Sequence, residues 1–324
     1  MIKYFSLGYN KLSMFENALL FFVGFFFIWV GSGLIVSSAD RIAKSLKLSS
    51  FALSFFILGL LTSIPEFSLG VSSLVTDEPE IIVGTLLGGI VVMFLLVIPL
   101  LAIMGNGIKL SSDFDKTRMT ISLMLVTLPS LFVLDQKISF FEGIFMVIAY
   151  ITVLIYIQSK KGVLSEKSVE ALAQRTYSFL DIGKVILGVV IVFLASALVV
   201  DKTEYFANIY SISPFLIGLV LLSIGTNLPE LSLSVRSVVQ GKKDVAFGDY
   251  IGSASANTLL LGLFATAQRG NIVTVERFYL IYLFTLIAVV FFYFFARSEK
   301  KISRTEGFIL LTFYILFILF EVIL

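Results

Sequence analysis

The stretch Leu221–Glu230 reads L-L-S-I-G-T-N-L-P-E, and it has a twin in Gly59–Glu66, which reads G-L-L-T-S-I-P-E. Each copy lies in a long apolar segment and places a proline directly before a glutamate. Proline has no backbone N–H and blocks the hydrogen bond to the carbonyl four residues earlier. We therefore predict two broken helices, in which the carbonyls of Leu61 and Gly225 lose their usual donors and become free to bind something else.

The composition is that of a protein that spans a membrane several times. Of the 324 residues, 58% are hydrophobic and only 14% are charged, and the mean hydropathy is +1.02. Soluble domains of this size do not have so apolar a composition. A carboxylate in the middle of a membrane-spanning helix is costly, so we expect Glu66 and Glu230 to face a cavity and to have a function there.

The sequence contains neither cysteine nor histidine. This excludes disulfides, thiolate metal sites and the commonest transition-metal ligand, and it leaves hard cations held by oxygen: Na⁺, Ca²⁺, Mg²⁺ or Mn²⁺. We expect no permanently bound cofactor and no enzymatic activity, and a membrane hydrolase is a remote alternative because no nucleophile motif is recognisable. The expected partners are inorganic cations and the lipid bilayer, with no nucleic acid and no obligate protein partner.

Ten hydrophobic segments follow one another along the chain. They span residues 17–38, 51–75, 80–104, 119–134, 140–158, 182–200, 214–239, 244–267, 276–296 and 305–323. Each is long enough for one membrane-spanning helix or nearly so. We therefore predict an all-α membrane protein with ten transmembrane helices, of which the second and the seventh are the broken ones.

An internal repeat relates the two halves of the chain. A shift of 164 residues aligns residues 32–96 with the second half without a gap and superposes the threonine, proline and glutamate of the two quoted stretches. The shift also pairs Gly84 and Gly88 with Gly248 and Gly252. Each half holds five spans, an odd number, so the second half enters the membrane with opposite polarity. Inverted repeats of this kind are typical of secondary transporters.

Lysine and arginine predict the orientation. Of the 24 such residues, 16 lie in the odd-numbered loops and only six in the even loops and the termini. Because basic loops stay on the cytoplasmic side, we expect both termini outside. The predicted units are a first five-helix repeat at 1–158, a cytoplasmic connector at 159–181 and a second repeat at 182–324. We expect the protein in the plasma membrane of a prokaryotic cell.

Polar side chains gather near the two breaks. Helices 2 and 7 supply Thr62, Ser63, Glu66, Thr226, Asn227 and Glu230. On the eighth segment, Asp249, Ser253 and Asn257 are spaced by four and share one helical face. Two carboxylates with hydroxyls, amides and free carbonyls suit a desolvated Ca²⁺ ion or a few Na⁺ ions.

These residues also have simpler structural interpretations. The two glutamates could form a structural pair bonded by hydroxyls, and the prolines could be kinks that neighbouring helices tolerate. Asp249 could be a helix-start carboxylate favoured by the helix dipole. Ser253 and Asn257 could be interhelical hydrogen-bonding residues.

The repeated pattern G-T-(S/N)-x-P-E, followed at a fixed distance by G-(N/D)-x-x-G-S-x-x-x-N, resembles the α-repeats of the sodium/calcium exchanger family, within the cation/Ca²⁺ exchanger superfamily. The resemblance covers both halves and is strongest over residues 32–96 and 196–262. It implies a ten-helix antiporter of the prokaryotic type in which one site alternately takes Ca²⁺ or Na⁺ and changes sides by sliding of spans 1 and 6. By motif position it places all the candidate ligands named above, apart from Asp249, at that site.

The chain departs from the family pattern mainly in its first half. Leu61 stands in place of the motif glycine, and on the third segment Thr85, Gly89 and Met93 replace Asn, Ser and Asn. In the second half, Asn227 replaces Ser, Asp249 replaces Asn, and Asn257 stands where these exchangers often have Asp. The first half of the ion cage is therefore poorer in oxygen than the family norm.

We predict a secondary active antiporter that exchanges Ca²⁺ for Na⁺ by alternating access at a midplane carboxylate site. One alternative is exchange of Ca²⁺ or another divalent cation for protons, in which one buried glutamate takes up a proton. Another is a degenerate member of the family that binds an ion without transporting it, which the ligand-poor first half suggests.

Overall fold

The computed structural model describes most of the chain, and all statements below concern the described part. It comprises residues 12–45, 63–109, 116–159, 179–228, 231, 247–268, 272–273, 278–298 and 301–323. These residues are almost entirely helical, and the few strands among them are two residues long. The predicted all-α class is confirmed.

The elements of the first half are α1 (Met14–Ser45), α4 (Ile64–Val75), α5 (Pro79–Val92), the π-helical turn η3 (Met93–Val97), α6 (Ile98–Met104), β1 (Ile108–Lys109), α7 (Lys116–Phe132), the 3₁₀ turn η4 (Val133–Asp135), β2 (Lys137–Ile138) and α8 (Phe140–Ser159). Those of the second half are α10 (Phe179–Tyr210), α11 (Pro214–Ile217), the π-helical turn η5 (Gly218–Leu222), α12 (Ser223–Thr226), α14 (Phe247–Ala267), β3 (Ile272–Val273), α15 (Phe278–Ser298), β4 (Lys301–Ile302) and α16 (Arg304–Ile323).

Several described helices are long and apolar enough to cross a membrane. They lie at Met14–Ile35, Pro79–Met104, Thr117–Asp135, Phe179–Tyr210 and Phe278–Arg297. Shorter apolar helices cover Ile64–Val75, Phe140–Tyr156 and Pro214–Thr226. α10 continues to Tyr210, ten residues beyond the hydrophobic segment predicted to end at residue 200, because its helix carries on through the charged sequence around Asp201 and Glu204.

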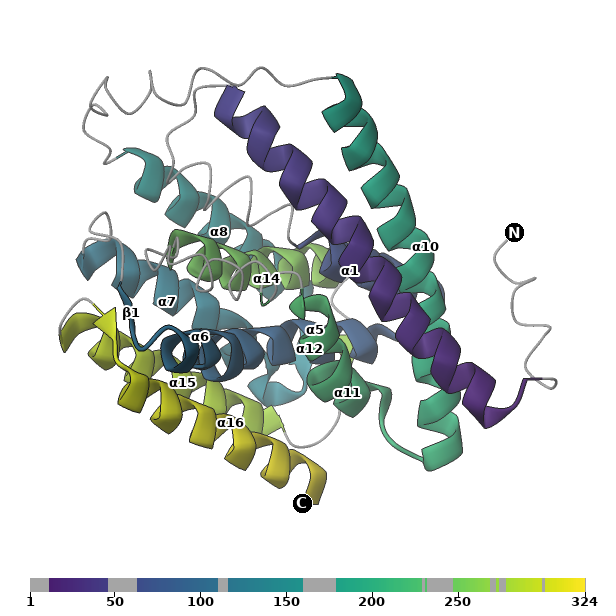
Figure 1. Ribbon diagram of the computed structural model, residues 1–324. Helices are drawn as coiled ribbons and strands as arrows, with labels where there is room; N and C mark the ends of the chain where they lie inside the picture. The colour runs from purple at the N-terminus through teal and green to yellow at the C-terminus, as the bar shows by residue number, and fades with distance from the viewer. Residues whose placement is uncertain are drawn as a thin grey trace.

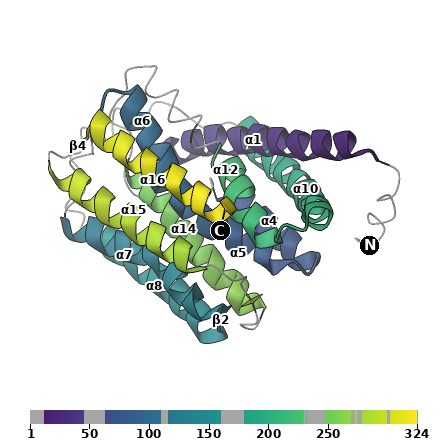
Figure 2. The same ribbon diagram turned by 90° about the horizontal axis from the view of Figure 1, so that it is seen from below.

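α1 and α10 run side by side as a pair at the edge of the molecule (Figures 1 and 2). Glycines allow the close approach. A Cβ added at Gly31 would lie 2.9 Å from the Gly188 carbonyl oxygen, and one at Gly188 would lie 2.7 Å from the Gly31 oxygen. Small residues of this kind are the usual means by which membrane helices pack backbone to backbone. The pair meets the rest of the molecule through Phe25, whose ring lies against Gly225, and through Phe193, whose ring centroid lies 6.1 Å from that of Phe67.

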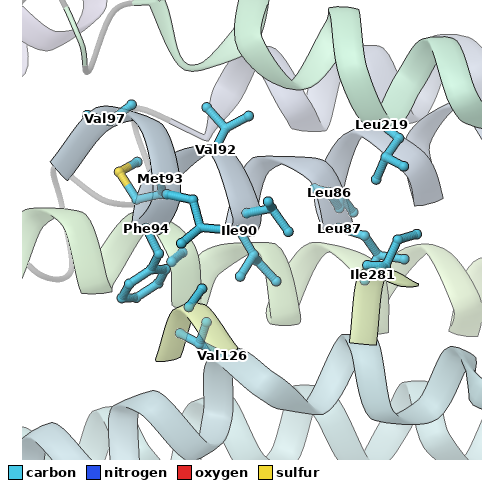
Figure 3. Packing of buried hydrophobic residues seen from close by; sticks show 14 of the residues in the cluster. Leu86, Leu87, Ile90, Val92, Met93, Phe94, Val97, Val126, Leu219 and Ile281 are labelled. Atoms are coloured by element: carbon cyan, nitrogen blue, oxygen red, sulfur yellow. The ribbon is translucent and has the colours of Figure 1, made fainter. Parts of the chain in front are cut away.

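α5 forms the centre of the fold. All its residues from Ile81 to Val92 are buried, as expected of a helix that is apolar on every side. Figure 3 shows its apolar side chains in one cluster with Val126 of α7, Leu219 of η5 and Ile281 of α15. Gly84 and Gly88 of α5 lie directly against the backbone of α11 and η5, which leaves no room for a side chain.

The elements of the two halves recur at the interval of 164 residues. The bounds of α8 and α16 differ by 164 residues at both ends, and the same shift relates β1 to β3 and β2 to β4. The strands pair across the halves, β1 with β4 through Ile108 and Ile302, and β2 with β3 through Ile138 and Ile272. The internal repeat therefore extends well beyond the residues that sequence similarity aligns.

Candidate cation-binding site

α4 begins at the first of the two predicted breaks. Ser63 precedes the helix, and Pro65 lies in its first turn, where a missing N–H costs nothing because that group has no partner inside the helix. Glu66 follows in the same turn and is only 3% exposed. The helix start agrees with the predicted break, while Thr62 and Leu61 lie outside the described residues.

The carboxylate of Glu66 lies against the other half of the chain. The side chain of Thr226, at the end of α12, is next to it, and the Thr226 hydroxyl itself donates to the Ser223 carbonyl oxygen at 3.5 Å. The Oε2 atom of Glu66 is fully buried and has no hydrogen-bond partner within the described part of the chain. A buried carboxylate oxygen that lacks a donor is costly unless a cation or a proton lies beside it.

The second break lies at the end of α12. There the backbone N–H of Asn227 lies near the Gly225 carbonyl oxygen, two residues earlier. A contact over so short a stretch of chain has a poor hydrogen-bond angle, so the oxygen keeps lone pairs for a ligand. The effect of Pro229 on this carbonyl stays a prediction. Pro229 and Glu230 lie outside the described residues.

Two asparagine side chains lie close to this turn with fixed orientations. The Asn227 Nδ2 atom donates to the Ser223 carbonyl oxygen at 2.8 Å. The Asn257 Nδ2 atom of α14 donates to the Leu86 carbonyl oxygen of α5 at 3.1 Å. Because a carbonyl only accepts, each amide must present its nitrogen to it. No described group donates to either amide oxygen, so both Oδ1 atoms keep their lone pairs.

Six of the nine predicted ligands have described side chains, and all six are buried. They are Ser63, Glu66, Thr226, Asn227, Ser253 and Asn257. The structure places Glu66 next to Thr226 and brings Asn227 and Asn257 to the same point of α5, while Ser253 lies one turn from Asn257 on α14. The side chain of Asp249, in the first turn of α14, is outside the described part, as are Thr62 and Glu230.

The α5 side of this region carries little that could hold a cation. The Thr85 hydroxyl donates to the Ile81 carbonyl of its own helix at 2.7 Å. Gly89 has no side chain, and a Cβ added there would lie 2.9 Å from Asn257 Nδ2 and 3.3 Å from Asn227 Nδ2. Met93 is buried and begins η3.

Sequence reasoning missed the π-helical turns η3 and η5. Such turns leave a widened hydrogen-bonding pattern and are frequent at functional sites. Pro99, in the first turn of α6, is a signal that could have indicated η3, because it removes a backbone donor two residues after that turn. Nothing comparable in the sequence marks η5, where Gly218 lies against Ile81 of α5.

Carboxylates also gather around the turn between α4 and α5. Asp77 and Glu78 lie between α4 and α5, Glu80 opens α5, and Glu204 lies near the end of α10. Burial raises the pKa of Glu78, and the negative charges of Glu80, Glu204 and Asp77 raise it further. Within the described residues, no group of three acidic side chains has an arrangement that could hold a metal ion.

Comparisons with known proteins agree with this architecture. The chain is 28% identical over 302 residues to the inner membrane protein YrbG of Escherichia coli (strain K12), which covers 87% of the chain and 91% of YrbG. It is 24% identical over 342 residues to the sodium/calcium exchanger MaX1 of Methanosarcina acetivorans, with 93% and 97% covered. A structure of the sodium-calcium exchanger NCX_Mj, soaked with 2.5 mM Na⁺ and 0.1 mM Sr²⁺, has the same fold, with a TM-score of 0.66 at 23% identity over 94% of this chain and 99% of that one.

The family itself is established by a match along almost the whole chain. The sequence model described as sodium/calcium exchanger protein matches residues 16–158 and again residues 181–323. This confirms the resemblance that the repeated motifs indicate. The chain therefore belongs to the sodium/calcium exchanger family and is an integral, multi-pass membrane transporter, not an enzyme.

Proposed function

We propose that this protein is a secondary antiporter that exchanges Ca²⁺ for Na⁺ at a midplane site built on Glu66 and Glu230. The observation that carries the proposal is the buried Glu66 carboxylate, which lies next to Thr226 of the other half and has one unpartnered oxygen. Carboxylate, hydroxyl and amide oxygens are the ligands that Ca²⁺ and Na⁺ prefer. The family membership, and the names of MaX1 and NCX_Mj, support these two cations.

The proposed architecture has ten spans in two inverted five-helix repeats, divided at 1–158, 159–181 and 182–324. Three observations support it: elements recur at an interval of 164 residues, strands of one half pair with strands of the other, and the family model matches twice. An odd number of spans in each half inverts the second repeat. The distribution of lysine and arginine supports an arrangement with both termini outside.

Alternating access would use the edge pair of helices. α1 and α10 contact each other through Gly31 and Gly188, and they meet the remaining helices mainly through apolar surfaces. An apolar contact lacks the directional bonds that would hold a single register, so it suits a sliding element. We propose that movement of this pair opens the site to each side in turn.

Exchange for protons is the second candidate, and the same Oε2 atom favours it. A protonated Glu66 would carry its own hydrogen-bond donor and would remove a buried charge. In that case a proton, rather than Na⁺, would replace the divalent cation during the return step.

The test is radioactive Ca²⁺ uptake by the purified protein in liposomes, driven by an outward Na⁺ gradient in one arm and an outward proton gradient in the other. Glu66→Gln and Glu230→Gln remove the proposed charges, and Glu80→Gln is the control for loss of a carboxylate at the start of α5. We expect Na⁺-driven uptake that both site variants abolish and the control retains. Uptake driven by protons alone would establish the second candidate, and folded protein without flux in either arm would contradict both.

A further inference from the structure

We infer that Gly89 and Asn257 leave cation ligands on only one side of the site. A hydrogen bond from the Asn257 side chain to α5 takes the place of a cation between the third and eighth spans. This inference rests on the proposed function, because it concerns how many cations the same site binds. It identifies Asn257 as a residue that determines coupling between Na⁺ and the divalent cation.

The first observation is the bond between α14 and α5. Asn257 Nδ2 donates to the Leu86 carbonyl oxygen at 3.1 Å, across 171 residues of sequence. Both groups are buried. A main-chain oxygen that could serve a cation is therefore engaged by an N–H group that belongs to the other half of the protein.

The second observation is the space beside Gly89. A Cβ there would lie 2.9 Å from Asn257 Nδ2 and 3.3 Å from Asn227 Nδ2, so two amide NH₂ groups converge where a side chain is missing. Amide nitrogens only donate, and their hydrogens carry partial positive charge. A cation at this point would meet the two NH₂ groups first, and the amide oxygens would have to turn toward it before they could bind it.

The third observation is the chemistry of α5. The stripe of Thr85 and Gly89, continued by Met93 at the start of η3, offers one hydroxyl, which donates within its own helix at 2.7 Å, and one thioether, which is a soft ligand. Hard cations are thus served by Glu66, Thr226 and the α14 face. On the α5 side, the hydrogen bond from the Asn257 side chain connects the two halves without an ion.

Replacing the amide with a carboxylate should reverse this arrangement. In Asn257→Asp, an oxygen would face the Leu86 carbonyl, and two oxygens at that distance repel each other unless a cation or a proton lies between them. The variant should therefore acquire an additional cation. Asn17→Asp is a matched control, because Asn17 is also buried and donates Nδ2 to backbone oxygens, those of Leu12 and Ser13 at 3.3 and 3.1 Å, but near the start of α1.

The experiment measures Na⁺ binding without transport. Purified full-length wild type, Asn257→Asp and Asn17→Asp are titrated with NaCl, at constant ionic strength with choline chloride, and the unfolding temperature is followed at two pH values. At saturation, the unfolding free energy rises linearly with the logarithm of the Na⁺ concentration, and the slope is proportional to the number of ions that the native state binds. We expect the apparent number of Na⁺ ions to rise by about one in Asn257→Asp, most clearly at the higher pH, and to stay unchanged in Asn17→Asp.

An equal Na⁺ dependence for wild type and Asn257→Asp at both pH values would overturn the inference. If Asn257→Asp does not fold, Gly89→Ser decides. Its Cβ would displace the two amide nitrogens, which would otherwise lie 2.9 and 3.3 Å from it, and its hydroxyl would add an oxygen to α5. An unchanged number of Na⁺ ions in this variant would count against the inference. Failure of the proposed function has a different signature. Wild type would then show no Na⁺-driven Ca²⁺ uptake in liposomes, whatever the variants do in the binding assay.

Discussion

The third and eighth spans are related by the internal repeat, yet α5 and α14 differ sharply in chemistry. α5 is buried and apolar on every side, and its stripe facing the site carries Thr85, Gly89 and Met93. The matching stripe of α14 carries Ser253 and Asn257, both buried. Along this stripe α14 carries a hydroxyl and an amide, while the hydroxyl of Thr85 bonds its own helix. α5 is therefore a packing element, and the amide of Asn257 lies beside the missing side chain of Gly89.

The largest effect on stability should come from Gly88→Ala. A Cβ at this position would strike the Leu219 carbonyl oxygen and lie 2.8 Å from the Cβ of Ser223, and backbone atoms cannot move aside as flexible side chains do. We expect a loss of about 3 kcal/mol of unfolding free energy, the upper part of the range for overpacking a core. Thermal unfolding of the purified protein measures it.

Gly33→Ala is the matched control for that change, since no atom lies within 4 Å of the Cβ it would add. It makes the same chemical replacement in α1, where the helix has room. If Gly33→Ala and Gly88→Ala were equally stable, α5 would not be the tightly packed element that the comparison with α14 requires.

The α14 face should be more sensitive than the α5 face in binding. Ser253→Ala removes a buried hydroxyl one turn from Asn257, and we expect the affinity for Ca²⁺ to fall about tenfold, the value of one hydrogen-bond-sized interaction of roughly 1.4 kcal/mol. Thr85→Val keeps the shape and removes a hydroxyl that already bonds its own helix, so we expect a change below about twofold. Ca²⁺-dependent thermal stabilisation measures both. A larger loss of Ca²⁺ affinity in Thr85→Val than in Ser253→Ala would show that the ligands lie on α5 and not on α14.

The sequence predicted the fold class and the position of the first break because hydropathy and proline act locally. The start of α4 at Ile64, with Pro65 in its first turn, follows directly from the missing N–H of proline. The register of 164 residues also predicts where the second copies of α8 and the short strands lie. These features need no knowledge of which groups meet in space.

Contacts between distant segments could not be predicted in the same way. Periodicity places Asn257 on the polar face of its helix, but it does not show that the amide reaches Leu86 or that Gly89 leaves room for it. The effect of Pro229 on the Gly225 carbonyl stays a prediction, because Pro229 lies outside the described residues. The positions of Thr62, Glu230 and the side chain of Asp249 remain predictions from the sequence alone.

The smallest expected effect concerns Glu78, directly before α5. Its pKa is raised by partial burial and by the nearby charges of Glu80, Glu204 and Asp77, so the native state binds a proton more tightly than the unfolded chain. Stability is therefore lost as pH rises from about 4 through this raised pKa, because the charged form is disfavoured in the native protein. Glu78→Gln should flatten this part of the pH profile of the unfolding temperature and make the protein more stable than wild type at neutral pH. The substitution removes no capping bond, since the Glu78 side chain makes none to α5.

Glu204→Gln should give a smaller change in the same direction, because it removes only one of the charges that act on Glu78. Identical pH profiles for wild type and Glu78→Gln would show that the start of α5 carries no electrostatic strain, and the difference between α5 and α14 would then lie wholly within the membrane.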